Sequence, residues 1–332
     1  MTRSTETTAE RETTEPSTTT GETSDDGVTG VVGTLLWNDT ESRPRAPVRV
    51  LGVYVASFVG IFLLPGLLLT GISLPPSVNG AATNLVAAGV ALAIVVVSAK
   101  YVDGRTLAAY GLARSPATVR DFLAGGLVGT LGAATTLSVS LVAGWATVAA
   151  VFSPGTGSTT SPFGLAMLGY VCQWLFVAFW EELIFRGLIT TYTVEGLRDR
   201  LSDRRALVGG VVVAAVIFSA GHFPQSAAAF LHRAILGAVL GAAYVWTGSL
   251  ALPVGLHFAV NFTQNNVFGQ AAAADGASVL PMVIRPTFTG PEWAVGLYGV
   301  VNVAGGLLLL VAVAGYVVVV HESLGDRLPS TL

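Results

Sequence analysis

Long runs of apolar residues without a single charge constrain this chain more than any other feature of its sequence. Residues 81–98 and 305–320 contain no acidic or basic side chain. A helix needs about 20 apolar residues to cross the hydrocarbon core of a bilayer, and these runs approach that length. Of the 332 residues, 52% are hydrophobic and only 11% are charged, a composition that water-soluble domains of this size do not have. We therefore predict an all-α, polytopic membrane protein.

The same pattern predicts about eight transmembrane spans. They lie at residues 48–70, 80–99, 120–152, 163–190, 206–222, 227–247, 250–266 and 293–319. Basic residues gather before the first predicted span, after the second and after the fourth. Because short cytoplasmic connections are enriched in Lys and Arg, we expect a multi-pass protein of the cell membrane with both termini in the cytoplasm.

The two ends of the chain differ from its apolar centre. Residues 1–45 are rich in Thr and Glu, and such a composition cannot bury enough surface to fold, so we predict a disordered cytoplasmic tail. Residues 46–322 form the predicted transmembrane domain, and residues 323–332 form a second cytoplasmic tail. The net charge of −3 leaves no basic stripe for phosphates, which argues against a nucleic-acid partner. The expected partner is the lipid bilayer.

Small residues recur four positions apart in two predicted spans, as Gly125 with Gly129 and Gly237 with Gly241. Such pairs allow helices to approach closely in membranes, so we interpret them as packing sites. The single cysteine, Cys172, excludes an intramolecular disulfide. No internal repeat is evident, and this removes the strongest sequence pointer to a secondary transporter.

A few polar side chains interrupt the apolar spans, and the functional argument depends on them. A charged residue near the centre of a spanning helix costs about 2.5–3.5 kcal/mol on insertion scales. Such residues therefore persist where they are paired or line a polar cavity. We interpret the set as an internal site and not as side chains that reach the interface. It consists of Glu181, Glu182, Arg186, His222, His257 and Asn261.

Helical spacing separates the first three of these residues. Glu182 and Arg186 are four residues apart and share one face of a helix, so they can form an ion pair. Glu181 points about 100° away from Glu182. Its carboxylate is therefore free to meet another helix.

The same spacing applies to the other polar residues. His257 and Asn261 are four residues apart, as are Phe218 and His222, so each pair shares a helix face. Three helices can thus bring a carboxylate, two imidazoles and an amide to one cavity. These groups suit hydrolysis by an activated water molecule, and Glu181 with the two histidines also resembles a set of zinc ligands.

Helix length poses one difficulty for this convergence. At about 1.5 Å per residue, His222 falls nearer the outer membrane face than Glu181. We expect strong tilt, or a bend beside Pro224 or at Gly209 and Gly210, to bring His222 down to the site.

Three motifs occur in order and resemble those of the CAAX protease and bacteriocin-processing family. This family, also called CPBP or Abi, includes the type II CAAX prenyl endopeptidases. The resemblance covers about residues 163–266, and it is specific because all three motifs lie in predicted spans. The motifs are Glu181-Glu-Leu-Ile-Phe-Arg186, Phe218-Ser-Ala-Gly-His222, and the segment from Thr247 to Asn261 that contains His257.

The resemblance implies an intramembrane endopeptidase that cleaves a membrane-associated or lipidated protein or peptide. It implies that Glu181 is the base that activates water and that His222 helps to orient this water. His257 and Asn261 would stabilise the oxyanion. The motif helix would be held in shape by Glu182 and Arg186.

Phe218 belongs to the structural support of the same predicted site. Two accounts of the chemistry stay open, because family members are commonly classed as metalloproteases while a glutamate and water mechanism needs no metal. We favour the metal-free account, since one carboxylate, two histidines and an amide form an unusual zinc set. In the alternative, Glu181, His222 and His257 would bind zinc or another divalent metal.

Two other functions also fit a polar cluster inside a membrane. The first is a proton-coupled transporter, in which buried Glu and His residues form a proton relay. The second is a non-catalytic scaffold or immunity protein, in which the cluster only binds a partner. Substitution of Glu181 separates these hypotheses, because only the protease loses peptide cleavage as a result.

Overall fold

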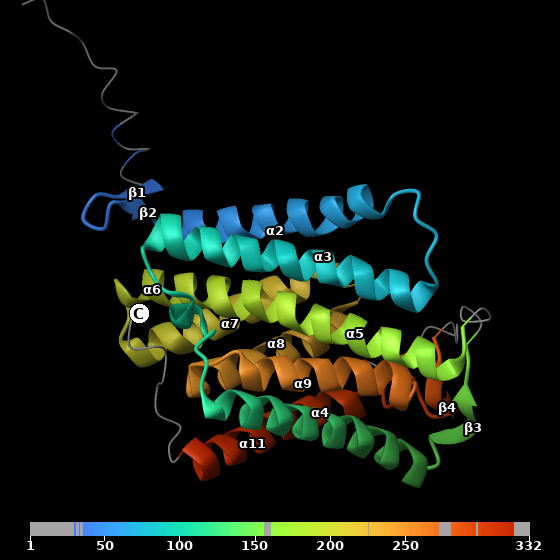
Figure 1. The fold of residues 1–332 in the computed structure, drawn as a ribbon. Coiled ribbons are helices and arrows are strands. Elements are labelled where there is room, and N and C mark those ends of the chain that lie inside the picture. The colour runs from blue at the N-terminus through green and yellow to red at the C-terminus, as the bar shows by residue number, and fades with distance from the viewer. Residues whose placement is uncertain are drawn as a thin grey trace, which may run out of the picture.

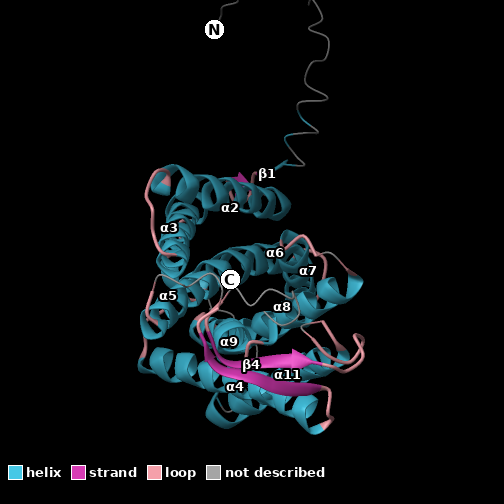
Figure 2. Ribbon diagram, turned by 90° about the vertical axis from the view of Figure 1, so that its right-hand side faces the viewer, coloured by secondary structure: helices cyan, strands magenta, loops and turns pink. Residues whose placement is uncertain are grey.

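Long helices lying side by side make up most of the fold (Figure 1). The computed structural model describes Gly30, Gly33 and residues 36–155, 161–224, 226–271, 280–296 and 298–321. α2 and α3 lie together on one side of the bundle, α4 and α11 lie on the opposite side, and the others lie between them (Figures 1 and 2). The long helices are α2 (Ala46–Leu69), α3 (Pro76–Val97), α4 (Pro116–Val142), α5 (Phe163–Glu182), α7 (Asp203–Gly221), α8 (Ala227–Thr247), α9 (Ala251–Phe262) and α11 (Val300–His321).

Several helices continue through short segments of different helical geometry. α5 passes through the π-helical segment η3 (Leu183–Thr190) into α6 (Thr191–Arg198), well beyond the predicted span end at residue 190. α3 is followed by the π-helical segment η1 (Ser98–Asp103) and α9 by η4 (Thr263–Val267). A 3₁₀ turn, η2 (Leu107–Tyr110), precedes α4. π-Helical turns are rare and often occur at functional sites.

Seven of the described helices are long and apolar enough to cross a membrane. The remaining predicted span, residues 250–266, corresponds to α9 with η4, which is shorter and lies among the other helices (Figure 2). Along α9 nearly every side chain up to Val260 is buried. The prediction of an all-α, polytopic helix bundle is confirmed.

The predicted span at residues 120–152 is wrong in its last third. α4 ends before Gly144, whose φ of 71° is typical of the glycine that terminates a helix. The chain then forms β3 (Ala146–Ser153), which pairs antiparallel with β4 (Met282–Phe288) across one end of the bundle (Figure 2). Hydropathy does not separate the two structures, because a strand of Ala, Val and Phe is as apolar as a spanning helix.

The two pairs of small residues lie at close helix contacts, as predicted. A Cβ atom on Gly125 would lie 2.3 Å from the carbonyl oxygen of Leu252 in α9, and one on Gly129 would lie 2.8 Å from that of Leu256. Across the bundle, the glycine pair of α8 packs against α7. Such backbone approaches tolerate no side chain, so these glycines set the distance between the helices.

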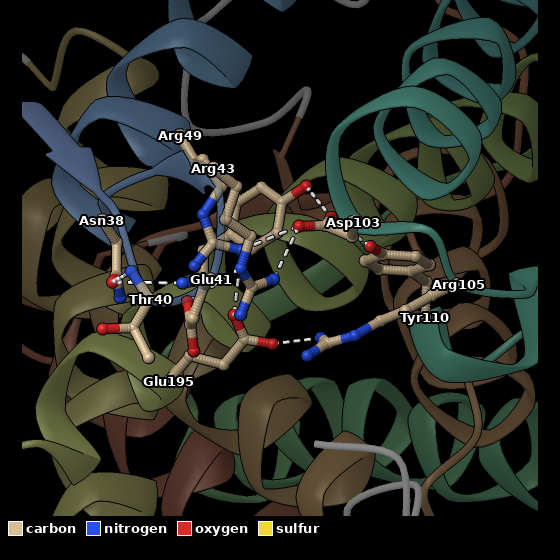
Figure 3. Close-up of polar contacts among 10 residues, drawn as sticks. Asn38, Thr40, Glu41, Arg43, Arg49, Asp103, Arg105, Tyr110 and Glu195 are labelled. Carbon is tan, nitrogen blue, oxygen red and sulfur yellow. Dashed lines mark hydrogen bonds and ion pairs between the residues drawn. The ribbon is translucent and has the colours of Figure 1, made fainter.

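An ion network anchors α2 at one end of the bundle (Figure 3). Asp103 accepts hydrogen bonds of 2.9 Å from both Arg43 and Arg49. Glu195 of α6 lies 2.9 Å from Arg49 and also pairs with Arg105. We call the end of the bundle that holds these three arginines the basic end. In the sequence these arginines indicate only the orientation of the chain, and nothing in it predicts the network.

Two tyrosines complete the network. Tyr110 and Tyr192 both donate hydrogen bonds to Asp103, the latter over 2.6 Å, and the guanidinium of Arg49 stacks on the Tyr192 ring at 4.3 Å. Burial and the Asp103 carboxylate raise the pKa of Tyr110 well above its usual value. The hydroxyl therefore stays protonated and continues to donate. α2, α3 and α6 are held together at this end.

A short hairpin lies within the predicted N-terminal tail. β1 (Trp37–Asn38) pairs with β2 (Arg43–Pro44), and the Arg43 side chain joins the network at Asp103. Residues 36–45 are thus part of the folded domain and not of a disordered tail. Most of residues 1–35 and all of residues 322–332 lie outside the described residues.

Candidate active site

Glu181 is the second-last residue of α5, which continues directly into the π-helical segment η3. The residue is buried, and its Oε2 atom accepts no hydrogen bond within the described part of the chain. A buried carboxylate oxygen without a donor is costly. It is therefore a group that a substrate or a water molecule can satisfy.

Two histidines from other helices approach this carboxylate. Nε2 of His222, at the end of α7, lies 3.9 Å from Glu181 Oε1. Nε2 of His257, on α9, lies 3.6 Å from Glu181 Oε2. The three side chains that the sequence predicts to meet do meet, at separations that one water molecule can bridge by hydrogen bonds.

The second nitrogen of each imidazole fixes the orientation of its ring. Nδ1 of His222 lies 2.7 Å from the carbonyl oxygen of Phe218, which can only accept, so this nitrogen carries the proton. Nδ1 of His257 lies 2.7 Å from Glu182 Oε1 and donates in the same way. In the neutral rings, both Nε2 atoms therefore turn a lone pair toward Glu181.

Glu182 holds two partners at once. Its Oε1 atom also accepts a hydrogen bond of 2.9 Å from Arg186, so the predicted ion pair within the helix is present. Arg186 donates in addition to the Gly237 carbonyl over 3.1 Å, and this bond ties α8 to the motif helix. The glutamate is 0% exposed and the arginine 1%. Spacing along one helix predicted the Arg186 partner, but only tertiary structure brings His257 to Glu182.

The Phe218 ring fills the space between the polar side chains. Its centroid lies 4.6 Å from that of His222 and 5.9 Å from that of His257. On another side it lies 4.6 Å from the Arg186 guanidinium, close enough for a cation–π contact. The ring therefore packs against both imidazoles and against the Arg186 guanidinium.

Asn261 makes no hydrogen bond or ion pair with the other predicted site residues among those that the structure describes. It lies on α9 four residues after His257 and is half-buried. Its carbonyl accepts a hydrogen bond from Asn265, but its amide makes no hydrogen bond with the described residues. Its predicted role stays a proposal.

The expected bend at Gly209 and Gly210 is absent, whereas beside Pro224 the chain leaves the helix at His222, and Phe223 has a φ of 48°. α7 runs without interruption from Asp203 to Gly221, and the Gly209 and Gly210 positions are ordinary helix. Instead, α6 prolongs the preceding helix to Arg198, so the turn between α6 and α7 lies farther from the site than expected. Roughly 25 Å of helix then leads from Glu181 to this turn and about 28 Å leads back to His222, which brings the two side chains level.

A cavity of about 300 Å³ opens beside Glu181 and His222. Its walls are largely apolar and come from α2, α5, η3 and the end of α7. Trp180 lines it with an indole held by a 3.1 Å hydrogen bond to Asn84 of α3. The contribution of α2 was not predicted, because its aromatic residues do not differ in sequence from lipid-facing ones. The lining residues are Tyr54, Ser57, Phe58, Ile61, Phe62, Trp180, Glu181, Ile184, Phe185, Gly221, His222 and Phe223.

Among the described residues, no group of three or more His, Cys, Asp and Glu side chains is arranged to hold a metal ion. His257 also commits its Nδ1 atom to Glu182. That contact leaves Nε2 of His257 available, so the metal-free and the metal-bound accounts both stay proposals.

Fold and site together define a polytopic membrane protein with one carboxylate and two imidazoles facing each other inside its helix bundle. Residues 162–263 match the family model described as Type II CAAX prenyl endopeptidase Rce1-like. The resemblance drawn from the three motifs is confirmed over this segment, which is similar to the CAAX prenyl endopeptidases. No curated protein and no solved structure matches the chain.

Proposed function

We propose that this protein is an intramembrane endopeptidase that hydrolyses a peptide bond of a membrane-associated, lipidated substrate. The observation that carries the proposal is the approach of Glu181 to the Nε2 atoms of two histidines beside an apolar cavity. This arrangement lies within the segment that matches the prenyl endopeptidase family. An apolar cavity next to a general base suits a peptide that carries a hydrophobic chain.

In the proposed reaction, Glu181 acts as the general base. It takes a proton from a water molecule held between its carboxylate and the imidazole of His222, with His257 on the other side of the carboxylate. The water oxygen bonds to the carbonyl carbon of the scissile peptide and forms a tetrahedral intermediate. The C–N bond then breaks, and the proton passes from Glu181 to the leaving amine nitrogen.

The oxyanion of this intermediate needs hydrogen-bond donors. Asn261 supplies an amide N–H on the face of α9 that also carries His257. His257 donates from Nε2 if it enters the reaction as an imidazolium, whose charge pairs with the Glu182 carboxylate at its Nδ1. His222, tied to the Phe218 carbonyl, keeps its Nε2 lone pair for the water molecule.

The reaction as proposed uses only side chains of the protein. A carboxylate that accepts the proton and imidazoles that orient the water supply the groups that a hydrolytic metal would otherwise provide. We therefore expect a chelator such as EDTA to leave the activity unchanged. Loss of activity in EDTA that added Zn²⁺ restores would contradict the metal-free account.

The decisive experiment compares Glu181→Gln with the native protein in liposomes, using an S-farnesylated peptide that ends in a CAAX sequence and carries a fluorophore and a quencher. Because the amide cannot accept the proton, we expect cleavage to fall by roughly 100-fold or more. The matched control is Glu292→Gln, which changes an exposed glutamate far from the site and should cleave like the native protein. Equal cleavage by both variants would disprove the proposal, and proton flux without any peptide product would favour a transporter.

A further inference from the structure

One wall of the active-site cavity comes from α2, which lies outside the family match at residues 162–263. Five of its residues line the cavity opposite Glu181 and His222. These residues are Tyr54, Ser57, Phe58, Ile61 and Phe62. The family match therefore accounts for the reacting groups but not for the surface that faces them.

Ser57 stands out among these residues. Its side chain is 7% exposed, and Oγ has no hydrogen-bond partner among the described residues. Hydroxyls elsewhere in the spanning helices behave differently: Thr130, Ser140 and Thr263 each donate to the carbonyl four residues earlier. That local bond is the usual way to satisfy a hydroxyl inside a helix. Ser57 leaves its hydroxyl to the cavity.

The neighbouring Tyr54 brings α2 close to the reacting groups. Its hydroxyl would lie 3.4 Å from a Cβ atom on Gly221, the residue before His222. Tyr54 and Ser57 are three residues apart, so they share one face of α2. This face is turned toward the end of α7.

The other side of the cavity is aromatic and more open. Phe58 and Phe62 of α2 pack at 4.9 Å, and Phe58 meets Phe223 edge-on at 6.4 Å. These rings are 45%, 62% and 62% exposed in the order Phe58, Phe62, Phe223, so they form a mouth on the membrane-facing surface. Phe223 has a φ of 48° directly after His222, a conformation that is uncommon without glycine and concentrates at functional sites.

We propose that Ser57 is a substrate-binding residue whose hydroxyl forms a hydrogen bond with the main chain of the bound peptide beside the scissile bond. The aromatic mouth formed by Phe58, Phe62 and Phe223 packs against the hydrophobic chain that the peptide carries. The inference rests on the proposed protease function and identifies the surface that binds its substrate. A peptide main chain needs hydrogen-bond partners once it leaves water, and Ser57 is the buried, unpartnered hydroxyl in this wall.

The test measures binding separately from cleavage. All variants carry Glu181→Gln, so the peptide stays intact, and binding of a fluorescent S-farnesylated CAAX peptide is followed by anisotropy in nanodiscs. Addition of Ser57→Ala should weaken binding roughly three- to tenfold, the effect of one lost neutral hydrogen bond. The same substitution should raise the thermal unfolding temperature without peptide, because it removes a buried hydroxyl that has no partner.

Ser140→Ala is the matched control, because Ser140 is equally buried but donates to the Thr136 carbonyl outside the cavity. It should leave peptide binding unchanged. Equal binding by the Ser57→Ala and parent proteins, or no peptide binding by either, would overturn the inference. Failure of the protease proposal would show differently, as peptide that native protein and Glu181→Gln both leave uncut.

Discussion

At the scale of single residues, the most consequential group is Glu182, which carries no proton in the proposed reaction. Its carboxylate joins Arg186 on its own helix to His257 on α9. A buried charge is tolerated only when it is paired and hydrogen-bonded, and here the pairing also fixes which imidazole nitrogen faces Glu181. The buried ion pair between Glu182 and Arg186 therefore also holds the His257 ring in the orientation that the site needs.

Replacement of Arg186 tests this arrangement. Arg186→Met removes the cation and leaves the Glu182 carboxylate buried with an uncompensated charge, so the free energy of unfolding should fall by about 3–5 kcal/mol. Reversible unfolding in mixed micelles measures the change. The control is Arg198→Met, whose partner Asp203 is 79% exposed at the side chain and whose loss should cost about 1 kcal/mol or less. Similar losses of unfolding free energy in the two variants would show that Arg186 does not compensate a buried charge on Glu182.

At the scale of secondary-structure elements, α9 depends on its contact with α4. Gly255 of α9 lies so close to α4 that a Cβ atom there would sit 2.0 Å from the Phe122 carbonyl oxygen. His257 follows two residues later on the same helix. The contact between the two backbones therefore sets the position of an imidazole that faces Glu181.

We expect Gly255→Ala to push α4 and α9 apart. Strain of this kind costs about 1–3 kcal/mol of stability, and displacement of His257 should also lower peptide cleavage. Thermal unfolding and the liposome assay measure the two effects. Gly89→Ala in α3 is the control, because no heavy atom lies within 4 Å of a Cβ atom at that position, and it should gain up to about 1 kcal/mol from helix propensity. Equal stability and equal cleavage in the two variants would show that the contact between α4 and α9 does not position His257.

At the scale of the whole molecule, both ends of the helical domain lie at the basic end. α2 begins there and α11 finishes there, whereas the β3–β4 sheet lies across the opposite end (Figures 1 and 2). Because arginine-rich connections stay in the cytoplasm, we propose that the basic end is cytoplasmic and that the β3–β4 sheet faces outward. The site lies between these two ends.

Cysteine labelling in intact cells tests the orientation. Cys172→Ala removes the single native thiol, and Thr40→Cys or Thr287→Cys then places one thiol at an exposed position of either end. A membrane-impermeant maleimide should label Thr287→Cys in intact cells but Thr40→Cys only after lysis. The opposite pattern would reverse the proposed topology.

The sequence alone determined that the chain is a helical membrane bundle, because charge-free runs of this length have no other stable arrangement in a bilayer. It also predicted that Glu181, His222 and His257 would meet, since polar residues in such runs are expensive and their order matches a known family. The sequence predicted helix ends poorly. The helix that stops before Gly144 was extended too far, because hydropathy does not distinguish an apolar strand from a helix. The helix that runs to Arg198 was cut short, because hydropathy does not show how far a helix extends beyond the bilayer.

Only the tertiary structure decided which groups face each other. The link from Glu182 to His257, the ion network at Asp103 and the cavity wall formed by α2 all join residues that are far apart in the chain. Their side chains look ordinary in sequence, because a tyrosine or serine on a spanning helix reads the same whether it faces lipid, a neighbouring helix or a substrate. The physical difference lies in the partner, and folding alone brings the partner into place.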